Sequence, residues 1–365
     1  MSSICITNAR IWNGESFGEG DILVEDGRIL AIRDKAAVWE NAEIAQKARA
    51  AEFCYDAEGR IVSPGLVDIH VHMRGISPDQ FGIDAQMCCL PFGVTAAADA
   101  SGIKGSEALM DTFQVKGMTF VAALFRDNHA DFEQLEKLIG LFGEKTAGIK
   151  VYLIKDSGVE DITALKEVCQ FAHARNLRVM VHTTDSPVPM KEVLETLGEG
   201  DIFSHAYHGG RYTVADDDFA SLENARKRGV IIDAGMAGHI HTDFSVLKAA
   251  IQEGAIPDVI STDITRSSAY KRGGIYGMPM CMSIMRSLGM KEGDIFRAVT
   301  SNAAKALGKE MQWGYLSEGR CADITVLEYS EDGFDMRDKA GNHIESSEGY
   351  RCVLTISDGQ VVYRR

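Results

Sequence analysis

Two histidines separated by one residue, His70 and His72, close the apolar segment PGLVDIHVHMR at residues 64–74. Alternate side chains of a β-strand point to the same side, so both imidazoles can face one point. Imidazole is a common ligand of divalent metals, and the pair therefore indicates a metal site. Two strand histidines could also be simply buried and hydrogen-bonded. Asp68, two residues earlier, could orient His70 from behind the ligands, or it could be a polar residue whose hydrogen bonds are satisfied by backbone groups.

A lysine interrupts a second apolar run, GIKVYL, at Lys150. Burying an ammonium group is costly unless it is neutralised or paired. One interpretation is that Lys150 extends to solvent or faces outward. The other is that its neutral amine adds carbon dioxide and becomes a carbamate, an anionic oxygen ligand that can bridge two cations. Metal binding would favour that deprotonated, carboxylated form.

Three more polar side chains end apolar runs: His182 in RVMVHTTD, His205 in IFSHAYH and Asp263 in DVISTDI. Each of them alone could equally be a hydrogen-bonded core residue. All of them together, each at the end of an apolar run in one chain, are hard to assign to chance. The combined set therefore predicts a metal centre at the C-terminal ends of barrel strands, the face that carries the site in TIM-barrel enzymes.

The elements that must position these residues follow a βα pattern from about residue 64 onward. Eight apolar strand candidates occupy residues 67–73, 94–100, 118–125, 148–154, 178–184, 202–208, 230–237 and 258–264. Stretches of helical period lie between them, at 131–142, 161–175, 190–197, 216–228 and 244–253. Eight strands with helices in about 250 residues predict an α/β fold, the (β/α)8 TIM barrel. Periodicity alone would also permit an open doubly wound sheet.

Both ends of the chain read as short strands joined by glycine turns, such as Asn13-Gly14 and Asp26-Gly27. The simplest arrangement is a small β-sandwich domain built from residues 1–63 and 314–365, with the barrel inserted at 64–313. Residues 35–52 are expected to form a helix or an insert, and residues 291–307 one further helix.

Composition limits the classes of partner. The 365 residues are 45% hydrophobic with 36 Gly and 7 Pro, which is an ordinary globular composition. A net charge of −15 argues against nucleic acid as a partner. There is no basic leader and no apolar run of membrane-spanning length. The eight cysteines show no disulfide-framework or zinc-finger spacing, which predicts reduced thiols in a cytoplasmic protein.

The ordered set of polar residues resembles the ligand pattern of the amidohydrolase superfamily. That pattern is His-x-His after the first strand, a carboxylated Lys after the fourth, His after the fifth and sixth, and Asp after the eighth. The late segments RAVTSNAAKALG and LSEGRCADITVLE look like the family's closing helix and return strand. The segments CLPFGVTAAADASG and DAGMAGHIHTDFSVLKAAIQEGAIPDVISTDIT are most similar to the dihydroorotase- and deacetylase-like branch.

The resemblance implies two divalent metal ions, by default zinc, bridged by a carbamate on Lys150 and by a hydroxide. His70, His72 and Asp263 would hold the more buried ion, and His182 and His205 the other. Asp263 would act as general acid and base while the hydroxide attacks. The implied reaction is hydrolysis of a carbon–nitrogen bond in a cyclic amide or an N-acyl group.

Substrate contacts are expected on the loops after the strands. Arg74 completes the His-x-His-x-Arg spacing of dihydroorotases, in which the Arg holds a substrate carboxylate, although the loop GISPDQFG lacks the Glu-Pro-Gly that usually follows. The predicted substrate-binding residues are Arg74, Tyr152, His208, His239 and Arg266, with Asp99, Arg126, Tyr207 and His241 as further candidates. Several of them are cationic, which suggests a small anionic substrate. We also expect a homo-oligomer.

Three alternatives stay open. A deaminase of the same fold is the first, although many deaminases use a single metal and place no lysine on the fourth strand. An esterase is the second, because a hydroxide attacks esters more readily than amides. The third is a non-catalytic scaffold, which the survival of all six ligand residues disfavours.

Overall fold

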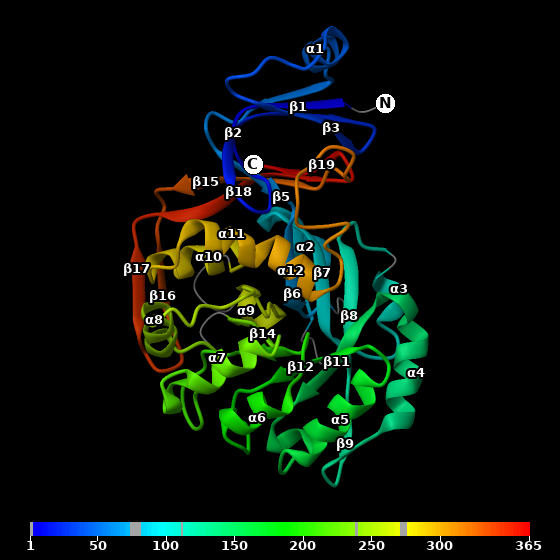
Figure 1. The fold of residues 1–365 in the computed structure, drawn as a ribbon, viewed down its shortest axis with the longest axis vertical. Helices are drawn as coiled ribbons and strands as arrows, with labels where there is room; N and C mark the ends of the chain where they lie inside the picture. The colour runs from blue at the N-terminus through cyan, green and yellow to red at the C-terminus, as the bar shows by residue number, and fades with distance from the viewer. Residues whose placement is uncertain (1–2, 74–81, 111, 238–239, 271–275) are drawn as a thin grey trace.

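The computed structural model describes residues 3–73, 82–110, 112–237, 240–270 and 276–365. Figure 1 shows two parts, a sheet made from the two ends of the chain (blue and red) and a larger body of alternating strands and helices (cyan to orange). None of the described helices has the length and apolar character needed to cross a membrane.

Strands from both chain ends pair in one sheet, in the order β19-β18-β15-β5-β1-β2-β3, with β4 paired to β1. These strands are β1 (Ser3–Trp12), β2 (Phe17–Glu25), β3 (Arg28–Asp34), β4 (Phe53–Asp56), β5 (Ile61–Pro64), β15 (Ile324–Ser330), β18 (Gly349–Ser357) and β19 (Gln360–Arg364). The antiparallel pairing of β5 with β15 joins the two ends of the chain. The expected partnership of the termini is therefore present, within a single hydrogen-bonded sheet. Two facing layers and the domain bounds stay predictions.

The terminal sheet has an apolar core of its own, to which both chain ends contribute, including Ile6, Ile22, Ile324 and Leu354. Helix α1 (Ala42–Arg49) lies beyond it and accounts for part of the stretch at 35–52. The Asn41 side chain caps this helix by accepting a hydrogen bond from the backbone N–H of Ile44.

The larger body is built around a parallel sheet of seven strands, in the order β14-β13-β12-β11-β8-β7-β6. They are β6 (Leu66–Val71), β7 (Val94–Gly102), β8 (Lys116–Ala122), β11 (Thr146–Tyr152), β12 (Arg178–His182), β13 (Ile202–Ser204) and β14 (Ile231–Ile232). Each of them overlaps one of the first seven predicted runs. Sequential neighbours in parallel order are the pattern of a TIM barrel.

The eighth predicted strand, residues 258–264, is not a regular strand, but it is bonded on both sides. Parallel bridges join Val259 to Asp233 and Ile264 to Val71, the two edges of the seven-stranded sheet. Asp263 has a φ of 46°, which interrupts the extended backbone that a strand requires. Because the segment still bridges both edges, the sheet closes as the barrel prediction requires.

Helices follow the strands. They are α2 (Ala85–Cys89), α3 (Glu107–Met110), α4 (Phe132–Phe142), α5 (Thr163–His173), α6 (Met190–Thr196), α7 (Ala220–Lys227), α8 (Phe244–Gln252), α9 (Arg266–Tyr270), α10 (Met278–Ser287), α11 (Glu292–Val299) and α12 (Ser301–Ala306). Two hairpins, β9 (Phe125–Arg126) with β10 (His129–Ala130) and β16 (Phe334–Arg337) with β17 (His343–Ser346), lie outside both sheets. Each of the five helical stretches predicted between the strands contains an observed helix. In α4, the buried Leu135, Leu138 and Phe142 form the inward stripe that helical periodicity predicts.

The single helix expected at 291–307 is wrong, because the chain breaks at Thr300 into α11 and α12. Thr300 has φ −129° and ψ −94°, outside the helical region. Its hydroxyl donates to the carbonyl of Phe296 and accepts the indole N–H of Trp12 at 3.0 Å. The helix is therefore interrupted where Thr300 contacts Trp12 of β1. A contact between residues so far apart in the sequence could not be predicted from local sequence.

The terminal sheet meets the barrel at Gly93, just before β7. Gly93 has a φ of +81°, and a Cβ there would lie 2.3 Å from Cγ2 of Thr325 on β15. The Thr325 hydroxyl donates to the Gly93 carbonyl at 2.6 Å. This position therefore combines a left-handed backbone with close packing between the two parts.

We expect Gly93→Ala to lower the free energy of unfolding by about 3 kcal/mol, since left-handed strain and a steric clash add together. Gly105→Ala is the matched control, because Gly105 has a φ of +97° and a methyl group added there would meet nothing within 4 Å. It should cost only about 1 kcal/mol. Chemical denaturation measures both, and equal losses would show that the contact with Thr325 contributes nothing.

Candidate active site

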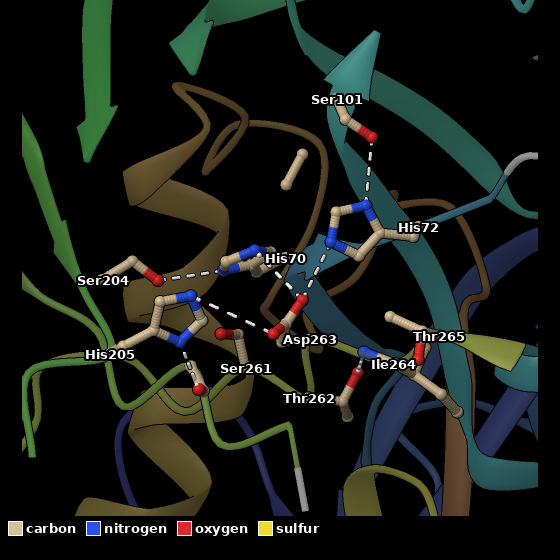
Figure 2. A network of polar contacts seen from close by, with 12 residues as sticks. His70, His72, Ser101, Ser204, His205, Ser261, Thr262, Asp263, Ile264 and Thr265 are labelled. Carbon is tan, nitrogen blue, oxygen red and sulfur yellow. Dashed lines mark hydrogen bonds and ion pairs between the residues drawn. The ribbon is translucent and has the colours of Figure 1, made fainter. Parts of the chain in front are cut away.

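His70, His72 and Asp263 come together where β6 meets the closing segment. The backbone N–H of Asp263 donates to the His70 carbonyl at 2.7 Å, and the N–H of His72 donates to the Ile264 carbonyl at 3.1 Å. This parallel exchange brings the three side chains to one point. Asp263 Oδ1 lies 2.9 Å from His72 Nε2 and 3.3 Å from His70 Nε2. Figure 2 shows Asp263 between His72 on one side and His205 on the other.

A second group contains three imidazoles, those of His182, His205 and His241. Their ring centroids are 4.2 to 5.0 Å apart. One nitrogen from each lies within 4.8 Å of the others, as do single atoms of His70, His72 and Asp263 in the first group. Asp263 Oδ2 is 3.9 Å from His205 Nε2, so this carboxylate lies between the two groups. The six predicted ligand residues include five of the six members of these groups.

Lys150, the sixth predicted ligand, is fully buried on β11. Its Nζ lies 3.2 Å from His70 Nε2 and forms no ion pair with a carboxylate of the described residues. Burial lowers the pKa of Lys150 to about 8, so a larger fraction of the amine is neutral at pH 7 than for an exposed lysine. The structure therefore places a buried amine beside His70 of the first group.

Hydrogen bonds behind the rings fix which nitrogen of His70 and of His205 carries the proton. Burial lowers the pKa of both imidazoles, which are therefore neutral with a single N–H each. His205 Nδ1 is 2.6 Å from the Gly235 carbonyl, which can only accept, so Nδ1 carries the proton. His205 Nε2 is then a bare lone pair, and it is buried without a hydrogen-bond partner in the part of the chain that the structure describes.

The same argument holds for His70 through a buried chain of hydroxyls. Ser204 Oγ donates to Asp233 Oδ2 at 2.6 Å and therefore accepts from His70 Nδ1 at 2.9 Å. Asp233 Oδ1 also accepts from the hydroxyl of Ser261 at 2.7 Å. The lone pair of His70 Nε2 thus lies 3.2 Å from Lys150 Nζ, which can donate to it, and 3.3 Å from the Asp263 carboxylate. At His205 the lone pair faces the same carboxylate without a donor among the described residues. A cation there would stabilise both groups, and this donor set fits divalent metal ions.

The pKa of Asp263 shows which form of this carboxyl group is present. Burial acts to raise it, but the proximity of His70 and the contact with His72 outweigh burial and hold the pKa well below its usual range. Asp263 is therefore a carboxylate. Burial also lowers the pKa of His182 well below its usual value and that of His241 to about 4. Neutral imidazoles around one carboxylate are the protonation states that metal binding requires.

Asp68 acts differently from the expectation that it orients the His70 ring. Its carboxylate accepts hydrogen bonds from the backbone N–H of His70, and from both the N–H and the hydroxyl of Thr262. It therefore holds the backbone of β6 against the closing segment. The group behind the His70 ring is Asp233, acting through Ser204. Sequence reasoning missed Asp233, although a lone acid ending the run VIID was a usable signal.

Asp99 was expected among the residues that contact substrate. It lies instead behind His72, buried, with its Oδ1 contacting the backbone N–H and hydroxyl of Ser101. Ser101 Oγ in turn lies 3.0 Å from His72 Nδ1. Both histidines of the His-x-His pair are thus backed by a serine and an aspartate.

Three of the five predicted substrate-binding residues lie among the described residues. Arg74 and His239 lie outside the described residues. Tyr152 is half-buried, with its ring 5.7 Å from that of His182. His208 is buried beside Met190, and Arg266 is exposed at the start of α9. Their roles toward substrate stay predictions.

The two remaining candidates, Arg126 and Tyr207, belong to neither group of candidate ligands. Arg126 is exposed on the hairpin strand β9. Tyr207 is fully buried, and its hydroxyl donates to the Ala255 carbonyl at 2.8 Å, which accounts for it as a core residue. A cavity of about 720 Å³, lined by Arg178 and Ile231 among others, lies where β12 and β14 begin. None of the six predicted ligands lines this cavity. The candidate metal site therefore lies at the opposite end of the barrel strands from the cavity.

A parallel barrel with imidazoles and a carboxylate gathered at its strand ends is the arrangement of a TIM-barrel enzyme with a candidate metal site. The chain belongs to the amidohydrolase family, whose model matches residues 61–362.

Relatives and solved structures agree with this family. The chain is 28% identical to a deacetylase of Agrobacterium fabrum over 371 residues, covering 94% of this chain and 87% of the relative. It is 25% identical to a dihydroorotase of Anaeromyxobacter sp. (strain K), covering 93% of this chain and 94% of the relative. The fold is shared with a solved dihydroorotase (TM-score 0.85, 23% identity, covering 100% of this chain and 98% of that one) and a solved adenine deaminase (TM-score 0.84, 22% identity, covering 100% of both chains).

We expect Asp233→Asn to weaken zinc binding about 10- to 100-fold, because an amide cannot accept from both Ser204 and Ser261 and the His70 ring loses its orientation. Competition with a chelating indicator measures the affinity. Asp335→Asn is the matched control, since the Asp335 carboxylate contacts His343 on the outer hairpin β16–β17. Zinc affinity that is unchanged in Asp233→Asn would contradict the role given to this carboxylate.

Proposed function

We propose that this protein hydrolyses a carbon–nitrogen bond of a small molecule, in a cyclic amide or an N-acyl group, at a centre of two divalent metal ions. The observation that carries the proposal is the lone pairs of His70 and His205 directed at the carboxylate of Asp263, with Lys150 buried alongside. The family and the names of its relatives, deacetylase and dihydroorotase, support the same reaction type.

The proposed ligands divide between two ions. His70, His72 and Asp263 would hold one ion, His182 and His205 the other, and a carbamate on Lys150 would serve both. Zinc suits this mixture of nitrogen and oxygen ligands. When bound, such ions lower the pKa of water toward neutrality and polarise a substrate carbonyl.

Asp263 is the proposed general base and acid. As a buried carboxylate at the centre of the site, it accepts a proton from the attacking water and passes it to the leaving nitrogen. Its low pKa keeps it ionised at neutral pH. The hydrogen bond from its own backbone N–H to His70 fixes its position, so the proton moves without rearrangement of the chain.

Specificity would come from the loops after the strands. Arg74, Tyr152, His208, His239 and Arg266 are the proposed substrate contacts. The positive charges of Arg74 and Arg266 favour an anionic substrate. Homo-oligomeric assembly and a cytoplasmic location remain expectations from the sequence.

The substrate class can be tested with purified enzyme containing zinc. We expect turnover of N-acyl amino acids or of dihydroorotate-like rings, and none of aminopurines such as adenine. Chelation should abolish turnover, and two equivalents of zinc per chain should restore it. Release of ammonia from aminopurines alone would identify a deaminase, turnover of esters alone an esterase, and a chain that binds no metal would be a scaffold.

The role of Lys150 has its own test. Lys150→Ala should lower kcat/KM at least about 10³-fold and reduce the zinc content, because the bridging anion is lost. Lys137→Ala, which removes an exposed lysine on α4, is the control. In ¹³C NMR after equilibration with ¹³C-bicarbonate, the wild type should show a carbamate signal that Lys150→Ala lacks. Full activity and metal content in Lys150→Ala would falsify the proposal.

A further inference from the structure

His241 lies in the second group of imidazoles, although the amidohydrolase ligand pattern has only two histidines there. Its ring centroid is 4.2 Å from that of His205 and 5.0 Å from that of His182, to which it is perpendicular. Its Nε2 is 3.5 Å from Asp263 Oδ2, the oxygen that His205 Nε2 also faces. The ring therefore points into the centre rather than toward solvent, and its side chain is only 17% exposed.

The hydrogen-bonding state of the ring leaves a nitrogen available. Among the described residues, no hydrogen bond reaches the imidazole of His241, and its Nδ1 is buried without a partner. His241 Nε2 and Asp263 Oδ2 are 3.5 Å apart and do not form a hydrogen bond. A buried imidazole that is fixed but unbonded is costly unless a ligand uses it. The rings of His182 and His205 converge on the same point as that of His241.

The backbone holds His241 in this place. The next residue, Thr242, forms an antiparallel bridge with His208, and its hydroxyl lies 3.3 Å from the Met236 carbonyl that accepts from it. The backbone N–H of Asp243 donates to the Tyr207 carbonyl at 2.9 Å, and the Asp243 side chain caps α8. The position of the ring is thus tied to the ends of the sixth and seventh strands, which also carry His205 and Gly235.

We propose that His241 is a third imidazole ligand of the metal ion held by His182 and His205. The inference rests on the proposed metal centre and deepens it. A third neutral nitrogen makes this position a three-histidine site, a donor set that suits zinc and cobalt. It also changes the expected balance of affinities, because an ion with three imidazoles is held more tightly than one with two.

The test titrates metal-free protein with Zn²⁺ or Co²⁺ alone, so that it does not depend on knowing a substrate. Wild type, His241→Gln and His241→Cys are compared, with His129→Gln as the matched control at an exposed histidine. Thermal unfolding of each metal-free protein establishes that it is folded. Absorption spectra of the Co²⁺ forms report the ligands directly.

We expect the wild type and His129→Gln to bind two ions per chain. His241→Gln should bind one of them at least tenfold more weakly and the other unchanged. His241→Cys should recover much of the affinity and add a thiolate-to-cobalt charge-transfer band. Both ions bound at wild-type affinity by His241→Gln, or no such band in His241→Cys, would overturn the inference, as would a wild type that binds fewer than two ions. Two ions in the wild type without any hydrolysis would instead contradict only the proposed reaction.

Discussion

The convergence of unprotonated nitrogen atoms on the buried carboxylate of Asp263 is the constraint on which the rest of this structure depends. The buried lone pair of His205 faces a charged oxygen without a hydrogen-bond partner among the described residues, and that of His70 lies near both Asp263 and Lys150. Such an arrangement is unfavourable on its own, since buried charges and polar atoms without partners cost free energy. A divalent cation between these groups would make the arrangement favourable, which is why the donor set fits the proposed metal centre.

The surrounding structure keeps that arrangement from relaxing. The rings cannot turn away, because Asp233 through Ser204 and the Gly235 carbonyl hold the opposite nitrogens of His70 and His205. The backbone contributes as well, with positive φ values of 58° at His205 and 46° at Asp263. Left-handed backbone at a residue other than glycine persists only where its surroundings impose it, and it clusters at functional sites.

The hydrogen bonds that close the barrel also assemble the candidate site. The segment 258–264 bridges both edges of the seven-stranded sheet, and the same bonds bring Asp263 to the His-x-His pair. Asp68, buried beneath, holds β6 to this segment through Thr262. The terminal sheet packs on the barrel near β7, where Thr325 contacts Gly93 at the opposite end of that strand from Asp99 and Ser101. The site is therefore formed at the strand ends remote from this junction.

The sequence by itself determined the order and type of the elements that alternate in the barrel, because strand and helix periodicity are local properties. It also determined the candidate ligands His70, His72, Lys150, His182, His205 and Asp263, since a polar residue ending an apolar run is visible without coordinates. Tertiary structure decided what depends on contacts between distant segments. It placed Asp233, rather than Asp68, behind the His70 ring, broke the helix at Thr300 against Trp12, and brought His241 from a loop into the second imidazole group. These outcomes depend on which side chains from separate strands meet, and that is fixed only when the sheet closes.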